Sequence, residues 1–521
     1  MSNHYEKYTA QLKKCFDFVG AQNSESEFVL LKGSSYKIKQ YYLEDNSARD
    51  IRGASMLLDY VEEKVIPNYI AAKLCRECII YSGGGNILCI LPKDVEENFA
   101  LELEKEAKKY LISANCAYVV MKVTKGEIEK DYKNVINRLE QKLADRKKLK
   151  LFNCFESESP FENSGIPWRN GEYISISAKK YSGKRDGVDV CDMCKSRIPS
   201  YVYGSKCVCG SCLHKRIIGE YSVNKFAEEY KKYNHTEPFK PDGKNDSFGY
   251  INNEHIAVVY GDGNNMGQII QNFTDIKQMM QFSENVKEAA KKSVYEAMGE
   301  CGIRKFAVVG LGGDDIFVIV SGDIAMQFAV KLNKKYSEIF NAYGGDYQSS
   351  TMSVGVCIAK PDTPLRVMLE TAEDKLSEAK EIAKNANIDT PNGTISFAVM
   401  NDPTEECNAG TAGCGLERTL APYTTKGMDD LLNVIKKLSG KSTAIRNIYD
   451  AYTNAESIEE AELFFKYRNA KENKDDKKIE APKIDGWSYS GGKYTRDGKN
   501  AFIWNDVLEL YKYAKESLEN K

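Results

Sequence analysis

The sequence predicts an α+β protein in which one β-α-β-β-α-β unit occurs twice. Apolar strand-like runs alternate with amphipathic helical stretches in the same order at residues 27–148 and again at 256–399. In each copy a glycine-rich turn joins two of the runs, which is typical of a β-hairpin. This element order is that of the ferredoxin-like fold, the core of palm domains. A chain of 521 residues leaves room for further domains.

The first copy, assigned to residues 1–150, has no carboxylates at its turns. Its first strand ends in Lys32-Gly33-Ser34, and its hairpin turns at Gly83-Gly84-Gly85-Asn86. Asparagine is uncharged and a poor substitute for a bridging carboxylate. We expect a degenerate palm that assembles no metal pair, but faces the second copy and holds a nucleotide or product. A purely structural role is the alternative. The expected elements are a strand at 27–31, a helix at 47–65, a hairpin at 78–91, a helix at 95–111, a strand at 117–121 and a charged helix ending near 148.

Paired cysteines mark the next region, residues 151–245. Cys191 and Cys194 form one Cys-x-x-Cys knuckle, and Cys209 and Cys212 form another. This spacing predicts a zinc ribbon closed by four thiolates, a type of site that is usually structural. Two nearby residues, Cys207 and His214, are competitors for the third and fourth ligand positions. Free reduced cysteines are the alternative interpretation.

The second copy, within residues 246–405, carries acids at both of its turns. A strand at 256–260 runs into Gly261-Asp262-Gly263, and the hairpin at 307–320 turns at Gly312-Gly313-Asp314-Asp315. Taken alone, the second tetrapeptide is an ordinary hairpin turn. If the strands are neighbours, however, Asp262, Asp314 and Asp315 converge on one point. Clustered carboxylates favour hard cations, so we expect a two-ion Mg²⁺ or Mn²⁺ site suited to phosphoryl transfer. The remaining expected elements are helices ending near 298, at 324–340 and at 365–384, and strands at 352–359 and 394–399.

Small residues beside these acids favour nucleotide binding. The stretch Gly263-Asn264-Asn265-Met266-Gly267 would let backbone N–H groups close around a triphosphate at the start of a helix. Gly312 and Gly313 would let the base or sugar lie over the hairpin. A lysine of the 365–384 helix would reach the phosphates; Lys380 is preferred and Lys375 is the alternative.

Composition limits the remaining classes. Fifteen cysteines with a net charge of −2 indicate a cytoplasmic protein with reduced thiols rather than a disulfide scaffold. No run approaches the length of a membrane span, and no signal segment is evident at the start. The near-neutral charge gives no overall attraction to nucleic acid. Residues 406–521 are expected to form a helical C-terminal domain packed on the second palm.

Together these motifs resemble the large polymerase/cyclase subunit of type III CRISPR effector complexes. The resemblance implies metal-dependent conversion of ATP into cyclic oligoadenylates, second messengers that switch on antiviral effectors, with Asp262, Asp314 and Asp315 as the metal residues. It covers roughly residues 25–450. It rests on Asp50-Ile51-Arg52-Gly53-Ala54-Ser55-Met56-Leu57-Leu58, the paired cysteine knuckles, Gly261 to Gly267, Gly312-Gly313-Asp314-Asp315, and Ser353-Val354-Gly355 through Ala379-Lys380.

Two departures from the family pattern bear on function. Many members begin with an HD nuclease domain, but none of the histidines here, His4, His214, His235 and His255, is followed by Asp. We therefore expect that nuclease to be absent. The C-terminal part is also short, which leaves little surface for docking a crRNA-bound complex. A stand-alone relative that makes a cyclic or linear nucleotide under other control is consistent with both features.

Two other functions compete with a nucleotide cyclase. The first is a structural, nucleotide-binding subunit of an RNA-guided complex, with RNA and sibling subunits as partners. The second is a template-dependent polymerase, although the sequence shows no large basic region to grip a duplex. ATP or another NTP is the expected substrate, a homodimer is an open alternative, and no membrane partner is expected.

Overall fold

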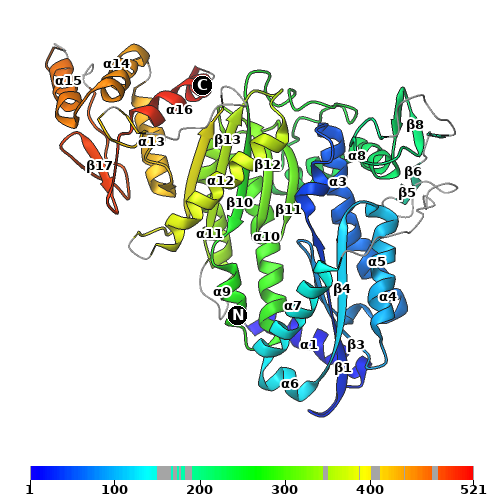
Figure 1. Ribbon diagram of the computed structural model, residues 1–521. Coiled ribbons are helices and arrows are strands. Elements are labelled where there is room, and N and C mark those ends of the chain that lie inside the picture. Colours follow the sequence, from blue (N-terminus) through cyan, green and yellow to red (C-terminus); the bar gives the residue numbers. More distant parts are fainter. Residues whose placement is uncertain are drawn as a thin grey trace.

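The computed structural model shows two β-sheets, each with its own helices, lying next to each other (Figure 1). It describes residues 2–149, 166–167, 173–174, 178–181, 190–343, 350–385, 388–400, 411–412, 414–438, 440–471 and 479–519. The mixed α+β architecture predicted from the sequence is confirmed. Every helix within these ranges is too short or too polar to cross a lipid bilayer.

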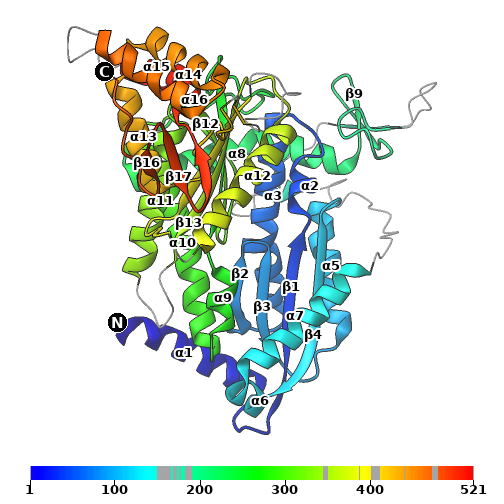
Figure 2. The same cartoon turned by 60° about the vertical axis from the view of Figure 1, so that its left-hand side comes forward.

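The N-terminal unit (residues 27–148) is built on a four-stranded antiparallel sheet. The strand order is β2-β3-β1-β4, with β1 central because it pairs with both β3 and β4. Helix α1 (Ser2–Val19) precedes the unit and packs against α10 of the next unit (Figure 2). The elements are β1 (Glu27–Tyr36), α2 (Ile38–Tyr42), α3 (Ala48–Tyr60), the π-helix η1 (Val61–Val65), α4 (Ile66–Lys73), the 3₁₀-helix η2 (Arg76–Cys78), β2 (Ile79–Gly83), β3 (Asn86–Leu91), α5 (Glu97–Leu111), β4 (Asn115–Thr124), α6 (Lys125–Lys130) and α7 (Tyr132–Lys148).

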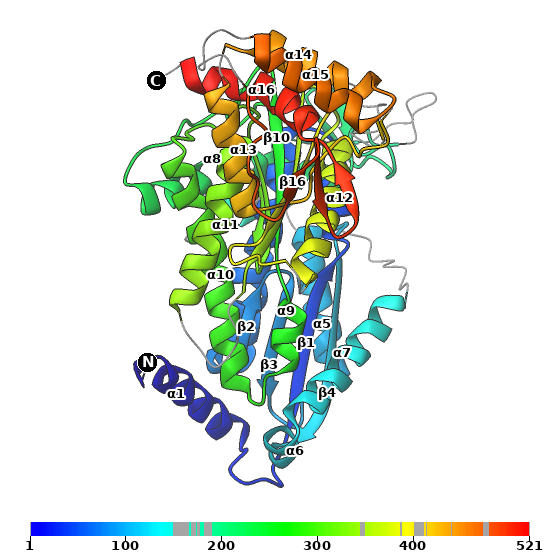
Figure 3. The same ribbon diagram turned by 90° about the vertical axis from the view of Figure 1, so that its left-hand side faces the viewer.

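The central unit (residues 256–399) repeats this arrangement and extends it. Its strand order is β11-β12-β10-β13-β14-β15, so its first strand again lies between the hairpin and a later strand. Helices α10 and α11 cover one face of the sheet and α12 covers the other (Figure 3). The elements are β10 (Ile256–Gly263), α9 (Met266–Gln271), α10 (Ile276–Glu300), β11 (Ala307–Gly312), β12 (Asp315–Ser321), α11 (Ala325–Ala342), β13 (Met352–Ala359), α12 (Leu365–Lys384), β14 (Thr394–Val399) and β15 (Tyr423–Thr424).

Two element predictions for this unit were wrong in detail. Strand β10 continues to Gly263, since β13 pairs with it as far as Met352, so Asp262 lies within a strand and not in a turn after it. The single helix expected after Gly267 is divided into α9 and α10. Asp275 ends the gap between them as the N-cap of α10, accepting a hydrogen bond from the N–H of Gln278 at 2.9 Å.

The remaining segments lie at the two ends of the molecule. The linking region holds β5 (Ile166–Pro167), β6 (Tyr173–Ile174), β7 (Lys179–Lys180), β8 (Tyr201–Tyr203), β9 (Lys206–Val208) and α8 (Gly210–Asn234). The C-terminal region holds α13 (Thr425–Lys437), α14 (Ser442–Asn454), α15 (Ile458–Lys471), β16 (Ser488–Ser490), β17 (Lys493–Arg496), β18 (Lys499–Ala501) and α16 (Trp504–Glu519). Its helix α13 packs on α11 of the central unit. The region is mostly helical, as expected, and also contains a three-stranded sheet that was not predicted. The expected boundaries at 150/151 and 405/406 fall outside the described residues.

The two units dock reciprocally. Helix α10 of the central unit packs on β2 of the N-terminal unit, and α3 of the N-terminal unit packs on β11 of the central unit. Helix α8 lies against both α3 and α10 (Figure 1). This exchange brings the two hairpin turns together, because each hairpin is covered by a helix of the other unit.

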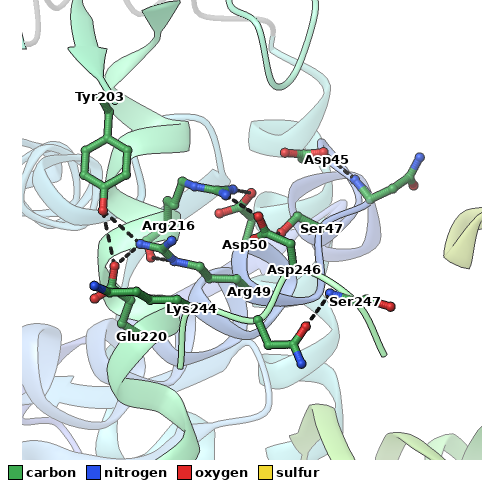
Figure 4. A network of polar contacts seen from close by, with 12 residues as sticks. Asp45, Ser47, Arg49, Asp50, Tyr203, Arg216, Glu220, Lys244, Asp246 and Ser247 are labelled. Atoms are coloured by element: carbon green, nitrogen blue, oxygen red, sulfur yellow. Dashed lines mark hydrogen bonds and ion pairs between the residues drawn. The ribbon is translucent and has the colours of Figure 1, made fainter. Parts of the chain in front are cut away.

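Helices α3 and α8 cross at a very short separation. A Cβ atom on Gly53 of α3 would lie 1.7 Å from the carbonyl oxygen of Lys215, so no side chain fits there. Around the crossing, Arg216 binds Asp50 at 2.8 Å and Asp246 at 2.5 Å (Figure 4). Burial raises the pKa of Asp50 to about 8 although Arg216 opposes this. The 50–58 motif thus has a direct structural role in joining the N-terminal unit to the linking region.

Candidate active site and cysteine cluster

The three aspartates of the central unit converge at one end of its sheet. Strand β10 pairs with β12 as far as Gly261 and Ile316, so Asp262 comes next to the hairpin turn that holds Asp314 and Asp315. A Cβ atom on Gly263 would lie 3.1 Å from the Cβ of Asp314. The strands that carry these aspartates, β10 and β12, are therefore neighbours, as the convergence of the acids requires.

Desolvation and the repulsion of neighbouring carboxylates make Asp314 and Asp315 hold protons more tightly than usual. Burial, followed by the charges of Asp262 and Asp315, raises the pKa of Asp314 to about 7. Desolvation and the charge of Asp262 raise the pKa of Asp315 to about 6, although part of this residue is exposed at the surface. Carboxyl groups perturbed in this way at one point are typical of a functional site.

Lysine 380 is the cation that reaches this cluster from α12. Its ammonium group forms an ion pair with the Asp262 carboxylate, and both side chains are about one-quarter exposed, at 28% and 25%. The alternative lysine, Lys375, instead pairs with Glu378 at 2.8 Å. The structure thus places Lys380, and not Lys375, at the acids.

The carboxylates could hold divalent cations, although they are not collapsed into a tight cluster. Within the described residues, their oxygens do not form a group of three ligand atoms all within 4.8 Å of one another. Like charges repel, and Lys380 draws Asp262 toward α12. The donor set nevertheless consists of hard oxygens, which suit Mg²⁺ or Mn²⁺. The pKa of Asp314 is raised by burial first and then by the charges of Asp262 and Asp315, and a bound cation would offset those charges.

The loop after β10 is held mainly by its own polar contacts. The N–H of Asn264 donates to the carbonyl of Thr351 at 2.8 Å, and its side chain bonds both Thr351 and Ser353. Met266 is buried, and Asn265 has φ 60° as the N-cap of the six-residue α9. A side chain at Gly267 would meet nothing within 4 Å. Among the residues proposed for nucleotide binding in this loop, Gly267 has free space around its Cα atom, whereas Asn264 and Met266 stabilise the loop by hydrogen bonding and burial.

Gly312 and Gly313 face the other unit. A Cβ atom on Gly84 would lie 2.8 Å from the backbone nitrogen of Gly313, and Gly84 itself has φ 61°. Both glycine turns therefore need to lack side chains so that their backbones can approach. This contact was not foreseen, since the sequence suggested that a base or sugar would use the space above Gly312 and Gly313.

The four knuckle cysteines lie together in the linking region. The ligand atoms of Cys191, Cys194, Cys209 and Cys212 are all within 4.8 Å of one another. Zinc–sulfur bonds of about 2.3 Å place tetrahedral sulfurs about 3.8 Å apart, close to the 4.0 Å between the Cys194 and Cys209 sulfurs. Four buried or half-buried thiols at this spacing fit a closed zinc site.

The two competing ligands lie outside this cluster. Cys207 is in β9, where its N–H donates to the Asp192 carboxylate and its carbonyl accepts from the Asp192 N–H. The Nδ1 atom of His214 is 3.5 Å from the Tyr110 carbonyl. Burial lowers the pKa of His214 to about 3, which keeps it neutral. Arg197 contacts the Cys209 sulfur at 3.3 Å and binds Glu44 through two hydrogen bonds of 2.8 and 2.7 Å. This arginine would support thiolate charge and tie the cluster to the N-terminal unit.

Comparison with known protein families identifies both units. A family model described as Cas10/Cmr2, second palm domain, matches residues 255–388, and one described as Csm1 subunit domain B matches residues 36–162. The chain belongs to the Cas10/Csm1 family of type III CRISPR large subunits. The resemblance inferred from the sequence motifs is thereby confirmed. None of the curated protein sequences matches the chain.

Solved Csm1 structures share the fold of this Cas10/Csm1 protein. Csm1 from T. onnurineus is 14% identical, with a TM-score of 0.58 over 97% of this chain and 73% of that chain. The Csm1-Csm4 cassette in complex with cA4 is 16% identical, with a TM-score of 0.58 over 97% of this chain and 73% of that chain. The cassette in complex with AMPPNP is 15% identical, with a TM-score of 0.52 over 85% of this chain and 65% of that chain. This Cas10/Csm1 chain thus spans 65% to 73% of these relatives' length.

One residue at the acids was missed in the sequence. Lys39 of α2 approaches Glu373 and Tyr260 of the central unit. It belongs to the polar stretch after β1, which has no motif to distinguish it. Only the docking of the two units reveals its position.

Proposed function

We propose that the protein is a metal-dependent nucleotidyltransferase/cyclase that converts ATP or another NTP into cyclic oligonucleotide second messengers in antiviral defence. The observation that carries this proposal is the convergence of Asp262 with Asp314 and Asp315, with Lys380 beside them. Acids that can hold divalent cations, with a lysine beside them, are the parts from which phosphoryl-transfer sites are built.

Each side chain has a role that follows from its position. Divalent cations held by Asp262, Asp314 and Asp315 would lower the pKa of the attacking hydroxyl and offset charge on the leaving pyrophosphate. Lys380 forms an ion pair with Asp262 and would turn to a phosphate oxygen when a nucleotide binds. Because its side chain is 28% exposed, this exchange requires no repacking of the core.

The structures of Csm1 relatives support a nucleotide role for this site. Solved Csm1-Csm4 cassettes are complexes with AMPPNP, pppApA, cA3 and cA4. We extend to this chain the inference that adenine nucleotides and their oligomers are substrate and product. ATP is accordingly the first nucleotide to test.

We further assign two ferredoxin-like palm domains, with boundaries at 1–150 and 246–405, joined by a zinc ribbon at 151–245 and followed by a C-terminal domain at 406–521. The catalytic palm is the second. In the first palm, Lys147 donates a hydrogen bond to Ser34 at 3.1 Å, a lysine at the strand end without carboxylates. This arrangement supports a role in holding a second nucleotide or the product without a metal pair.

The test is direct. Purified protein is incubated with labelled ATP and Mn²⁺, and the products are separated and identified by mass spectrometry. The expected result is pyrophosphate release and linear or cyclic oligoadenylates, abolished in Asp314→Ala/Asp315→Ala while the circular dichroism spectrum is unchanged. Absence of conversion of any NTP, with or without an RNA-guided partner complex, would overturn the proposal.

A structural role within an RNA-guided complex is the second candidate. It is favoured by the solved Csm1-Csm4 subcomplex of the type III-A CRISPR-Csm interference complex, which shares the fold at a TM-score of 0.57. Co-purification with RNA and sibling subunits, together with nucleotide binding but no turnover, would support it. A monodisperse, RNA-free protein that converts ATP would argue against it.

A further inference from the structure

Four cysteines far from the knuckle cysteines gather where α1 meets the N-terminal unit. Cys15 lies in α1, Cys75 is the N-cap of η2, Cys78 is the last residue of η2, and Cys89 lies in β3. Cys75 is half-buried and the other three are fully buried. The charge of Cys78 acts on both Cys15 and Cys89, so Cys78 is the centre of the group. No three of these four described sulfurs all lie within 4.8 Å of one another, unlike the four sulfurs of the knuckles.

Helix α1 holds Cys15 against η2. One helical turn before Cys15, the Nε2 atom of Gln11 donates to the carbonyl of Ile79 at 2.9 Å, and Ile79 directly follows Cys78. Side chains four residues apart share one face of a helix, which places Cys15 on the face that meets η2. A hydrogen bond with Cys15 lowers the pKa of the Cys78 thiol, although burial opposes this. Cys15 therefore stabilises the thiolate form of Cys78, the form that reacts.

Cys75 and Cys78 occupy a single 3₁₀ turn. The N–H of Cys78 donates to the carbonyl of Cys75 at 3.3 Å, and the two thiols also share a hydrogen bond. A turn closed in this way keeps its first and fourth Cα atoms within about 7 Å, and a disulfide needs Cα atoms roughly 4.4–6.8 Å apart. The two sulfurs can therefore be joined without moving α1 or the sheet.

The accessible side of this turn has a proton acceptor and a positively charged cavity. The Cys75 thiol donates to Oε2 of Glu77 at 2.8 Å. Burial raises the pKa of the Cys75 thiol, so the loss of its proton depends on such an acceptor. Arg76 and Glu77 also line a cavity of about 730 Å³, whose lining contains five basic residues and two acidic ones. A small reagent with a net negative charge would be concentrated there, beside Cys75.

We propose that Cys75 and Cys78 form a redox-active dithiol, which a small disulfide carrying carboxylates oxidises reversibly to an internal disulfide. The Cys75 sulfur attacks one sulfur of the oxidant as its proton passes to Glu77. The S–S bond of the oxidant breaks, and its first half leaves as a thiol after taking up a proton. The Cys78 thiolate then attacks the Cys75 sulfur and displaces the second half. The protein thereby gives up two electrons and two protons, and the oxidant gains both as two thiols.

This dithiol does not depend on the proposed function and is tested by peptide mapping of the full chain. The protein is incubated with oxidised glutathione, free thiols are blocked with N-ethylmaleimide in denaturant, and the protein is digested with trypsin without reductant. Trypsin cleaves after Lys73, Arg76 and Lys93, so the two cysteines fall in separate peptides, residues 74–76 and 77–93. Mass spectrometry should find these two peptides joined, and treatment with excess reduced glutathione before blocking should separate them.

Variants and fragmentation identify the partner of Cys75. Peptide 77–93 also contains Cys89, and fragmentation of the joined peptides distinguishes Cys78 from Cys89 without any substitution. Cys78→Ser should abolish the link, whereas Cys89→Ser and Cys15→Ala should retain it. Cys301→Ser, at a half-buried cysteine outside the group, is the matched control and should behave as the unmodified protein does. Absence of the link at excess oxidised glutathione, a bond located at Cys89, loss of the link in Cys15→Ala, or a link that reduced glutathione does not break would each overturn the proposal.

Discussion

The hairpin turns of the two units occupy the same place in the same motif, yet only one carries acids. Gly83 pairs with Asn86 across the first turn, as Gly312 pairs with Asp315 across the second. The residue before Asn86 is Gly85, where the central unit has Asp314. The two backbones therefore match, whereas the charges differ by two carboxylates.

The neighbouring strands extend the comparison. In the N-terminal unit Ser34 pairs with Asn86. In the central unit the last pair is Gly261 with Ile316, so Asp262 occupies the position equivalent to Ser34. All three acids thus have neutral counterparts in the N-terminal unit.

One feature is present in both units. Lys147 near the end of α7 contacts Ser34 at 3.1 Å, and Lys380 near the end of α12 contacts Asp262. A lysine at the strand end is therefore retained where the carboxylates are not. The difference shows that the fold places a lysine at the strand end in both units, whereas the side chains at three positions decide whether carboxylates gather there.

The largest contrast is expected at the paired strand ends. Asp262→Asn should lower the rate of ATP conversion by at least about a hundredfold, since a neutral amide cannot hold the cation that positions the reactants. Ser34→Ala should stay within a few-fold of the unmodified protein. Initial rates with saturating Mn²⁺ provide the measurement, and a Ser34→Ala variant as slow as Asp262→Asn would break the comparison.

Zinc removal should affect the region that joins the units before it affects either sheet. Cys191→Ser is expected to cost about 4 kcal/mol or more in stability, because the site would lose its closed ligand set. Hydrogen exchange should accelerate first in β8, β9 and the start of α8. Cys301→Ser, outside the cluster, is the control. Unchanged exchange in α8 after chelator treatment would show that the four thiols are merely reduced cysteines.

The retained lysines should differ in importance. Lys380→Met is expected to lower kcat/KM about tenfold or more, the scale of one charge-assisted contact. Lys147→Met should reduce it about threefold or less, and mainly at low ATP concentration, if the N-terminal unit holds a second nucleotide. Steady-state kinetics over a range of ATP concentrations measure both effects. Equal losses would mean that both units carry out the same step.

The contact between the turns can be isolated with two glycines of the same conformation. Gly84 and Gly204 both have φ 61°, but a Cβ atom would meet the Gly313 backbone at Gly84 and nothing within 4 Å at Gly204. Gly204→Ala should cost about 1 kcal/mol from backbone strain. Gly84→Ala should cost about 2–3 kcal/mol, as the turns must also move apart. Urea unfolding measures the difference, and equal costs would show that the turn contact is loose.

The smallest effect is expected from pH. The pKa of Asp314 is raised to about 7 and that of Asp315 to about 6, so the folded protein binds more protons than the unfolded chain over this range. Without metal, stability should therefore increase as the pH falls from about 7 toward the unfolded pKa of about 4. Metal affinity should fall over the same range, because protons compete for the carboxylates.

Other buried acids titrate in the same window, since burial also raises the pKa of Glu62 to about 7. Asp314→Asn supplies the reference. Its thermal stability should be less dependent on pH than that of the unmodified protein, and the difference should disappear when Mg²⁺ is present. An identical dependence of stability on pH in both proteins would show that burial and the neighbouring charges do not raise the pKa of Asp314.

Local patterns predicted much of this molecule. The repeat, the hairpins and the cysteine knuckles were recognisable because strand alternation and turn glycines depend on nearby residues alone. The preference for Lys380 over Lys375 could not be established from local patterns. Both lie on the same helix, and only the position of Asp262 on the sheet distinguishes them.

The sequence by itself determined the two related units, the acids at the turns of one of them, and their replacement by serine, glycine and asparagine in the other. Only the tertiary structure decided that Gly84 lies against Gly313 and that Lys39 stands beside Glu373 and Tyr260. The physical reason is that both contacts arise from the docking of one unit on the other. Docking depends on whole packed surfaces, including the close crossing of α3 and α8, and no short stretch of sequence encodes it.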